Sequence, residues 1–240
     1  VPEQLKDFRN FLYIVWKELN LPDPTPIQYE IASFMQSGDR RAIIQGFRGV
    51  GKSWICSAFV VHQLLLDPRK NILVISASKT RADDFSTFTL RIIHELAILE
   101  HLRPKPNQRF SKISFDVGLA PASHAPSVKS LGVTSQLTGS RADIIVADDV
   151  EVPNNSATQT MRDKLSEQIK EFDAILKPND DSKVLVLGTP QCEDTIYYKL
   201  SERGFKTRVW TAQYITPTKH ENAYNGNVSH LCVDSEKEGD

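Results

Sequence analysis

Short apolar runs alternate along the chain with longer stretches in which apolar residues recur every three or four positions. The continuous runs predict buried β-strands, and the longer period predicts amphipathic helices. We expect strands at 41–45, 71–76, 143–147, 184–187 and 205–210, and helices at 5–19, 52–66, 85–99 and 161–176. Apolar strands that alternate with helices are typical of a mainly parallel sheet covered on both faces. The pattern therefore predicts an α/β fold with a central sheet flanked by helices.

Two regions depart from this alternation. The runs 113–117 and 128–133 predict an inserted β-hairpin or an edge pair. Towards the C-terminus the pattern fades, and the last residues are acidic and weakly apolar. We therefore expect one domain over 1–217, with an N-terminal helical segment at 1–40, and an acidic linker or tail at 218–240.

The composition narrows the class of protein. The chain has 240 residues, of which 40% are hydrophobic and 25% charged, as in an ordinary globular domain. Its 29 basic and 30 acidic residues leave a net charge of -1, unlike the strongly basic charge usual for a protein that coats DNA. Any contact with nucleic acid is therefore expected to be local or transient, or to depend on another domain. The longest apolar stretch, of about 12 residues, is too short to span a bilayer. An odd count of 3 cysteines favours a reducing compartment, and we expect no membrane association.

The segment 46–53 matches the phosphate-binding pattern G-x-x-x-x-G-K-[ST] at every fixed position. It follows an expected strand and opens an expected helix, whose N-terminus adds partial positive charge. Lys52 is expected to reach the β- and γ-phosphates of ATP, the Ser53 hydroxyl to bind Mg²⁺, and Arg48 to contact the γ-phosphate. The expected nucleotide-binding residues of the loop are Gly46, Phe47, Arg48, Gly49, Val50, Gly51, Lys52, Ser53 and Trp54.

Two carboxylates follow the apolar run 144–147, a pattern typical of a Walker B strand. Asp148 is placed to hold Mg²⁺, and Asp149 to orient the attacking water or accept its proton. Many related ATPases have Glu directly after the metal-binding Asp, whereas here that residue is Asp, one methylene shorter. Glu151 is therefore an alternative, and the catalytic carboxylate is left open between Asp149 and Glu151.

Two further features lie near this strand. If 71–76 lies between the phosphate-loop strand and the acidic strand, the chain belongs to the P-loop branch with an added central strand, which includes many ATP-driven motors. Arg141 precedes the acidic strand, and an arginine finger acting across a subunit interface raises rates by about 10³–10⁵. The alternatives for Arg141 are a salt bridge to Asp143 and a solvated turn.

Together these motifs resemble the ATPase domain of the large terminase subunit of tailed bacteriophages, of the short-tailed podophage type. The resemblance runs over about 5–212 and is carried by 42–53, 76–79, 126–130, 136–151 and 187–190. It implies a P-loop NTPase of the RecA-like, ASCE type. It also implies an Mg²⁺-dependent ATPase that drives double-stranded DNA into a procapsid in the host cell cytoplasm. The implied assembly is a homo-oligomeric ring, pentameric in the family, docked on the portal protein and assisted by a small terminase subunit.

The resemblance also assigns roles to single residues. Gln28, after Thr25-Pro26, matches a glutamine that contacts adenine. Thr189 lies in Gly188-Thr189-Pro190, which matches a coupling motif that senses the γ-phosphate, and Arg141 falls where some members place a trans-acting finger. Family members carry a C-terminal nuclease, and too few residues follow Pro217 to hold one. We therefore expect a truncated motor domain or one half of a split terminase, without nuclease residues.

The DNA-contacting surface is left open by the sequence. Four cations without an acid among them, Arg103, Lys105, Arg109 and Lys112, lie within 101–115. This cluster is either a phosphate-contacting patch or a solvated loop.

Other classes of protein need features that the sequence lacks. A GTPase needs an Asn-Lys-x-Asp motif, an ABC-type ATPase needs a helix between its signature and the acidic strand, and a helicase normally needs a second RecA-like domain. A non-catalytic nucleotide-binding module is disfavoured by the set of Lys52, Ser53 and Asp148. The alternative function is another P-loop nucleic-acid translocase or helicase-like ATPase.

Overall fold

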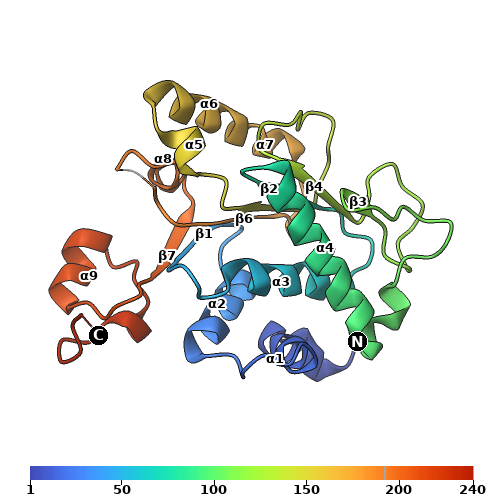
Figure 1. Cartoon of the computed structure of the whole chain (residues 1–240), viewed down its shortest axis with the longest axis horizontal. Helices are drawn as coiled ribbons and strands as arrows, with labels where there is room; N and C mark the ends of the chain where they lie inside the picture. Colours follow the sequence, from blue (N-terminus) through green and yellow to red (C-terminus); the bar gives the residue numbers. More distant parts are fainter. Residues whose placement is uncertain (192, 240) are drawn as a thin grey trace.

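A computed structural model describes residues 1–191 and 193–239, and in this part of the chain seven strands form one sheet (Figure 1). The strand order is β3-β4-β2-β5-β6-β1-β7. Every pairing is parallel except that of β3 with β4, which is antiparallel. The strands are β1 (Arg41–Gly46), β2 (Ile72–Ser76), β3 (Ser114–Phe115), β4 (Val128–Gly132), β5 (Ile144–Asp148), β6 (Lys183–Gly188) and β7 (Lys206–Trp210). The predicted α/β fold with a mainly parallel sheet is confirmed.

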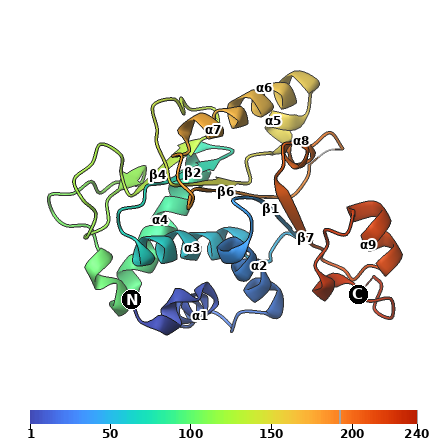
Figure 2. The same ribbon diagram turned by 180° about the vertical axis from the view of Figure 1, so that it is seen from behind.

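Helices cover both faces of the sheet, as Figures 1 and 2 show from opposite sides. One face carries α1 (Phe8–Glu18), α2 (Pro26–Ser37), α3 (Lys52–Leu66) and α4 (Lys79–Glu95). The other carries α5 (Pro153–Ser156), α6 (Gln159–Lys170), α7 (Phe172–Ile175) and α8 (Ile196–Glu202). Successive residues of a strand point to opposite faces, so that Val146 packs in one core and Ile145 in the other. The chain also forms the 3₁₀ turns η1 (Glu3–Lys6) and η2 (Ala97–Leu102).

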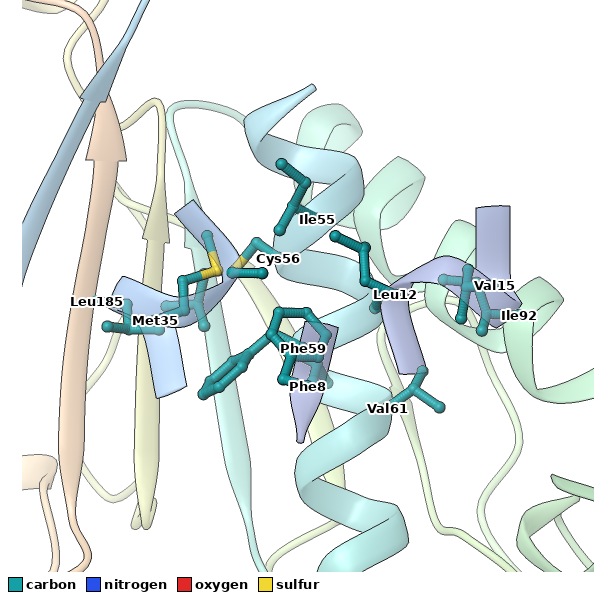
Figure 3. Close-up of a cluster of buried hydrophobic side chains, with 14 of the residues drawn as sticks. Phe8, Leu12, Val15, Met35, Ile55, Cys56, Phe59, Val61, Ile92 and Leu185 are labelled. Carbon is teal, nitrogen blue, oxygen red and sulfur yellow. The ribbon is translucent and has the colours of Figure 1, made fainter. Parts of the chain in front are cut away.

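Helix α3, which follows the phosphate loop, is enclosed by other helices. Figure 3 shows Phe59 of α3 close to Phe8 of α1, and their ring centroids lie 5.4 Å apart in an edge-to-face arrangement. Leu12 and Met35 complete this side of the core and are fully buried. Because close-packed cores resist displacement, this packing gives the start of α3 a fixed position.

The order of the strands corrects one sequence-based expectation. The strand between the phosphate-loop strand β1 and the acidic strand β5 is β6, whereas β2 (71–76 in the prediction) lies on the far side of β5. An added central strand is present, but a later segment of the chain supplies it. Strand order in a parallel sheet depends on pairing between distant segments, which the sequence order does not encode.

The predicted pair 113–117 and 128–133 forms the antiparallel edge pair β3–β4. β4 also pairs in parallel with β2, so it belongs to the main sheet and is not part of a separate hairpin. The helix expected over 161–176 is divided at Glu171 into α6 and α7.

The C-terminal segment differs from the acidic linker or tail that we expected for 218–240. It forms α9 (Pro217–Tyr224) and the 3₁₀ turn η3 (His230–Cys232), which lie beside β7 (Figure 1). Isolated parallel bridges join Val209 to Val228 and Ile215 to Val233, and Val228 is buried. This segment is held by a few buried residues at irregular spacing. For that reason the sequence shows no hydrophobic period that would predict a folded segment here. No described helix has both the length and the apolar character needed to cross a membrane.

Candidate active site

The phosphate loop connects β1 to α3 at the carboxyl edge of the sheet, where open α/β sheets bind their ligands. Gly49 and Gly51 have φ angles of 93° and 88°, a left-handed conformation that glycine adopts without a steric penalty. Gly51 is the residue that caps α3. Val50 is buried between them and anchors the loop to the core. The loop backbone is therefore shaped by its glycines and fixed by one apolar side chain.

Lys52 is folded back inside this loop. Its Nζ donates hydrogen bonds to the carbonyl oxygens of Gly46, at 2.6 Å, and Phe47, at 3.3 Å. Burial lowers the pKa of the Lys52 ammonium, against the opposing effect of Asp149 and Asp148. An ammonium that is partly desolvated and held by neutral carbonyls is suited to bind a phosphate oxygen.

Asp148 ends β5 and meets the start of α3. The Ser53 Oγ donates a hydrogen bond of 2.9 Å to its Oδ1, and only 9% of Asp148 is exposed. Burial, and next the negative charge of Asp149, raise the pKa of Asp148 to about 6. A hydroxyl and a carboxylate at this distance are hard oxygen ligands of the kind that Mg²⁺ prefers, together with phosphate oxygens and water. The two residues therefore fit the predicted Mg²⁺ site.

The two candidate catalytic carboxylates occupy different environments. Asp149 has a φ of 47°, and its side chain is 41% exposed, with its Oδ2 3.9 Å from Nη1 of Arg81. Glu151 is 2% exposed. Its Oε1 accepts hydrogen bonds from the Gln191 backbone N–H, at 3.0 Å, and the Thr195 hydroxyl, at 2.7 Å. Its Oε2 accepts one from the Ile196 N–H at 2.7 Å.

A cavity of about 660 Å³ opens above the loop, a size that suits a small-molecule ligand. Ten of the predicted residues line it: Gln28, Arg48, Gly49, Gly51, Lys52, Ser53, Trp54, Asp149, Glu151 and Thr189. Gln28 reaches the loop directly, because its Nε2 donates to the Val50 carbonyl at 3.0 Å. The Thr189 hydroxyl donates to the Gly46 carbonyl at 3.1 Å. The site therefore combines the turn after β1 with the ends of β5 and β6 and the start of α2.

The remaining predicted residues lie elsewhere. Asp148 lines an adjoining cavity together with Ser53, and Gly46 and Phe47 line a cavity towards β7. Arg141 lies just before β5, at the amino ends of the strands and so opposite the phosphate loop. There its Nη1 donates a hydrogen bond to the Ala174 carbonyl at 2.9 Å. Within one chain Arg141 is therefore not part of the nucleotide site. The alternative of an Arg141–Asp143 salt bridge is wrong, because the cation at the Asp143 carboxylate is Lys177.

Several residues of the cavity were missed by the sequence reasoning. From the N-terminal part of the chain these are Trp16, Leu21, Pro22, Asp23 and Thr25, and from the later segments Arg81, Val152, Pro153 and Gln191. Thr25 forms a reciprocal capping box with Gln28 at the start of α2, and the pattern Thr-Pro-x-Gln was the available signal for it. Arg81 comes from the first turn of α4, and no motif marked it. It reaches the site because β2 pairs with β5, so that α4 starts beside Asp149.

The four cations of 101–115 are partly neutralised. Arg109 forms an ion pair of 3.3 Å with Asp116, and Arg103 lies 3.8 Å from Glu100. Both acids lie just outside the predicted cluster, so the sequence window made the segment look more basic than its surroundings are.

The fold and the site define a P-loop nucleotide-binding domain. Residues 43–223 match the family described as terminase large subunit, T4likevirus-type, N-terminal, and the chain belongs to this family. It is 53% identical over 229 residues to the terminase large subunit of Enterobacteria phage T3, covering 94% of this chain and 39% of that protein. The chain therefore spans about two-fifths of the length of this relative.

Solved structures with the same fold include a Dbp5 variant of S. cerevisiae bound to Gle1 and IP6. It is 14% identical, with a TM-score of 0.56 over 86% of this chain and 52% of that chain. This likeness shows a shared fold only. The large terminase ATPase domain of Thermus phage P74-26 is 16% identical, with a TM-score of 0.47 over 77% of this chain and 71% of that chain.

Proposed function

We propose that this chain is the ATP-hydrolysing motor domain of a viral terminase large subunit, which translocates double-stranded DNA into a procapsid in the host cell cytoplasm. The observation that carries the proposal is the convergence of Lys52, Ser53 and Asp148 at one edge of the sheet, beside a cavity of nucleotide size. Membership of the terminase large subunit family supports the DNA-packaging role.

The proposed chemistry follows from the side chains at this edge. The N-terminus of α3 and the Lys52 ammonium bind the phosphates of ATP, and Arg48, exposed on the loop, contacts the γ-phosphate. Ser53 and Asp148 hold Mg²⁺, which supplies charge neutralisation on the phosphate oxygens. Gln28, whose side chain lies against the phosphate loop at Val50, contacts the base.

Of the two carboxylates, we assign the catalytic role to Asp149. Its side chain is partly exposed and lines the cavity, so it is free to orient water or take its proton. Both oxygens of Glu151 are already occupied by three donors. The Glu151 side chain is also almost fully buried, at 2% exposed, so water reaches it less readily than it reaches Asp149. The left-handed backbone at Asp149, rare for a residue with a side chain, is of the kind found at active sites.

The assembly is also part of the proposal. Thr189, bonded to the loop carbonyl of Gly46, is placed to respond when the phosphates shift the loop. Arg141 lies at the opposite edge of the sheet, from where it serves only the site of a neighbouring subunit. We propose a homo-oligomeric ring, pentameric as in the family, that docks on the portal protein with a small terminase subunit. Residues 1–217 form its motor domain.

ATP hydrolysis measured against protein concentration, with and without linear double-stranded DNA, tests this proposal. Activity that rises faster than linearly with protein concentration supports a site completed by a neighbour. Stimulation by DNA supports translocation. Hydrolysis strictly proportional to concentration would contradict the trans role of Arg141, and an equal rate in a Lys52→Ala variant would contradict the site itself.

A further inference from the structure

Glu151 is a buried carboxylate that joins two segments that both line the site. It follows Asp148 and Asp149 on the segment that leaves β5. Its three hydrogen-bond donors belong to Gln191, Thr195 and Ile196. These residues lie on the segment that leaves β6 and enters α8. The cations of the neighbouring segments pair with other acids: Arg81 with Asp149, and Arg162 and Lys199 with Asp194. Its charge is therefore satisfied by hydrogen bonds alone, which requires both segments to keep their relative position.

Each of the two segments is fixed on its own side. On the first, the Asn155 side chain donates to the Val150 carbonyl at 2.7 Å and accepts from the Val152 N–H at 2.8 Å. On the second, Thr189 is bonded to Gly46 of the phosphate loop. Glu151 thus closes a ring of contacts that runs through the phosphate loop, the acidic strand end and the start of α8.

Beyond Glu151 the contacts continue into α6. Asp194, next to Thr195, lies 3.3 Å from Arg162. Lys199 of α8 lies 3.7 Å from Asp163, and the Arg203 guanidinium, at the end of α8, donates to the Ser166 hydroxyl at 2.9 Å. A displacement of α8 is therefore transmitted to α6 through polar contacts spaced along α8, from Asp194 before it to Arg203 at its end. Figure 1 shows α6 and α8 together on the face opposite α3.

We propose that Glu151 is a positioning residue that transmits the nucleotide state of the Asp148–Asp149 edge to α8 and α6. The inference rests on the proposed function, because it takes a nucleotide phosphate to displace that edge. Glu151 would thus connect the nucleotide site to α8 and α6 by a second path, separate from the Thr189–Gly46 hydrogen bond. A carboxylate is needed because it only accepts hydrogen bonds. The amide of glutamine would turn a donor towards one of the three donors that Glu151 now satisfies.

Hydrogen exchange of α8 and α6, with and without Mg²⁺ and a non-hydrolysable ATP analogue, tests this inference. Four proteins are compared: wild type, Glu151→Gln, Thr195→Val and Asp149→Asn. Thr195→Val keeps the shape of the buried side chain and removes one hydrogen-bond donor to Glu151. It therefore tests the three hydrogen bonds that join Glu151 to Gln191, Thr195 and Ile196, which we call the tether, even if Glu151→Gln folds poorly. Asp149→Asn leaves all three Glu151 bonds in place and is the matched control at the neighbouring acid. Thermal unfolding of each variant separates loss of structure from loss of transmission.

We expect the analogue to change exchange in α8 and α6 of the wild type and of Asp149→Asn. In Glu151→Gln and Thr195→Val the same change should fall by at least half, while the affinity for the analogue stays within about twofold. A response of wild-type size in both tether variants would overturn the inference. So would a kcat in Glu151→Gln as low as in Asp149→Asn, with Thr195→Val at the wild-type rate, because Glu151 would then act on water.

The two proposals fail in different ways. If the wild type binds no analogue, the proposed nucleotide site is wrong, and the inference falls with it. If the wild type binds the analogue and exchange in α8 does not change, the site stands and the tether is overturned.

Discussion

Two acids of the same short segment, Asp143 before β5 and Asp148 at its end, differ in the number of their hydrogen-bond donors and in the direction of their pKa shifts. Asp143 accepts hydrogen bonds from the Asn71 N–H at 2.7 Å, the Lys177 ammonium at 2.8 Å and the Asn179 amide at 3.1 Å. Burial raises its pKa, but these donors outweigh burial and hold the pKa below the ordinary value. Asp148 has one donor, Ser53, and a second acid beside it, and its pKa is raised to about 6.

Under the proposed function, the contrast is one between a structural acid, Asp143, and a functional acid, Asp148. At the amino ends of the strands, the charge of Asp143 is compensated by its three donors. These hydrogen bonds join the start of β5 to Asn71, Lys177 and Asn179. At the carboxyl edge the charges are left with few partners within the protein. In the proposed function, a cation bound with the phosphates of a nucleotide supplies the missing compensation, as expected where perturbed carboxylates gather at a functional site.

The largest expected effect is on Asp148. Asp148→Asn removes the charged Mg²⁺ ligand, and we expect hydrolysis to fall by at least about 10³-fold, as for the loss of an essential charge-stabilising group. In metal-free buffer the same variant should be more stable than wild type by about 1–3 kcal/mol, because a buried and poorly compensated charge has been removed. Denaturant unfolding with and without Mg²⁺ measures the second effect. A destabilised variant in metal-free buffer would show that Asp148 is compensated in the way that Asp143 is.

Asp149→Asn should lower kcat by about 10²–10⁴-fold, the range for a residue that orients or deprotonates the nucleophile. The KM for ATP should change little, because Lys52 and the loop bind the phosphates. Steady-state kinetics of Asp149→Asn and Glu151→Gln, measured side by side, check the assignment. Equal loss in both variants would contradict the assignment of the catalytic role to Asp149 and, with Thr195→Val at the wild-type rate, the positioning role of Glu151.

Asp143→Asn should reverse the pattern seen at Asp148. We expect a loss of about 1–3 kcal/mol in the free energy of unfolding, since buried donors lose a charged acceptor, with hydrolysis near the wild-type rate. Asp173→Asn, which removes a surface pair with Arg41, is the control and should cost less than about 1 kcal/mol.

The pH dependence of stability sharpens this prediction. The folded pKa of Asp143 lies below its ordinary value of 3.8. Its contribution is therefore fully present above 3.8 and is lost as the pH falls through the folded value. Asp143→Asn should remove this part of the acid sensitivity. Unfolding curves for both proteins at neutral and acidic pH test it, and parallel curves would rule the effect out.

The smallest expected effect is on Arg81. Its pair with Asp149 is exposed and 3.9 Å long, so Arg81→Ala should lower kcat by no more than about fivefold, equivalent to about 1 kcal/mol. Arg91→Ala removes another exposed pair of α4, with Glu95 at 3.3 Å, and should leave hydrolysis unchanged. A loss at Arg81 as large as at Asp149 would instead make Arg81 a catalytic group.

The sequence predicted those parts of the site whose residues are neighbours in the chain. The phosphate loop and the pair Asp148–Asp149 each lie in a short segment, and their chemistry constrains residue types at fixed spacing. Strand boundaries also followed from apolar runs, because central strands are buried on both faces. The antiparallel edge pair was predicted for the same local reason.

What the sequence did not predict depends on contacts between distant segments. The insertion of β6 between β1 and β5 is a matter of pairing across the sheet. The partners of Glu151 lie 40 to 45 residues away in the sequence, so spacing alone left its role open beside Asp149. Neither Arg81 nor the C-terminal segment carries a periodic or motif signal. Arg81 is positioned by the pairing of β2 with β5, and the C-terminal segment by its bridges to Val209 and Ile215.

The most direct test of the account is Mg²⁺-dependent ATP hydrolysis by the wild type, Lys52→Ala and Asp148→Asn at matched concentration, with Asp143→Asn as the control from the opposite edge. We predict hydrolysis by the wild type and Asp143→Asn and background rates for the other two. Hydrolysis at the wild-type rate by Lys52→Ala or Asp148→Asn would contradict a nucleotide site at the carboxyl edge of the sheet.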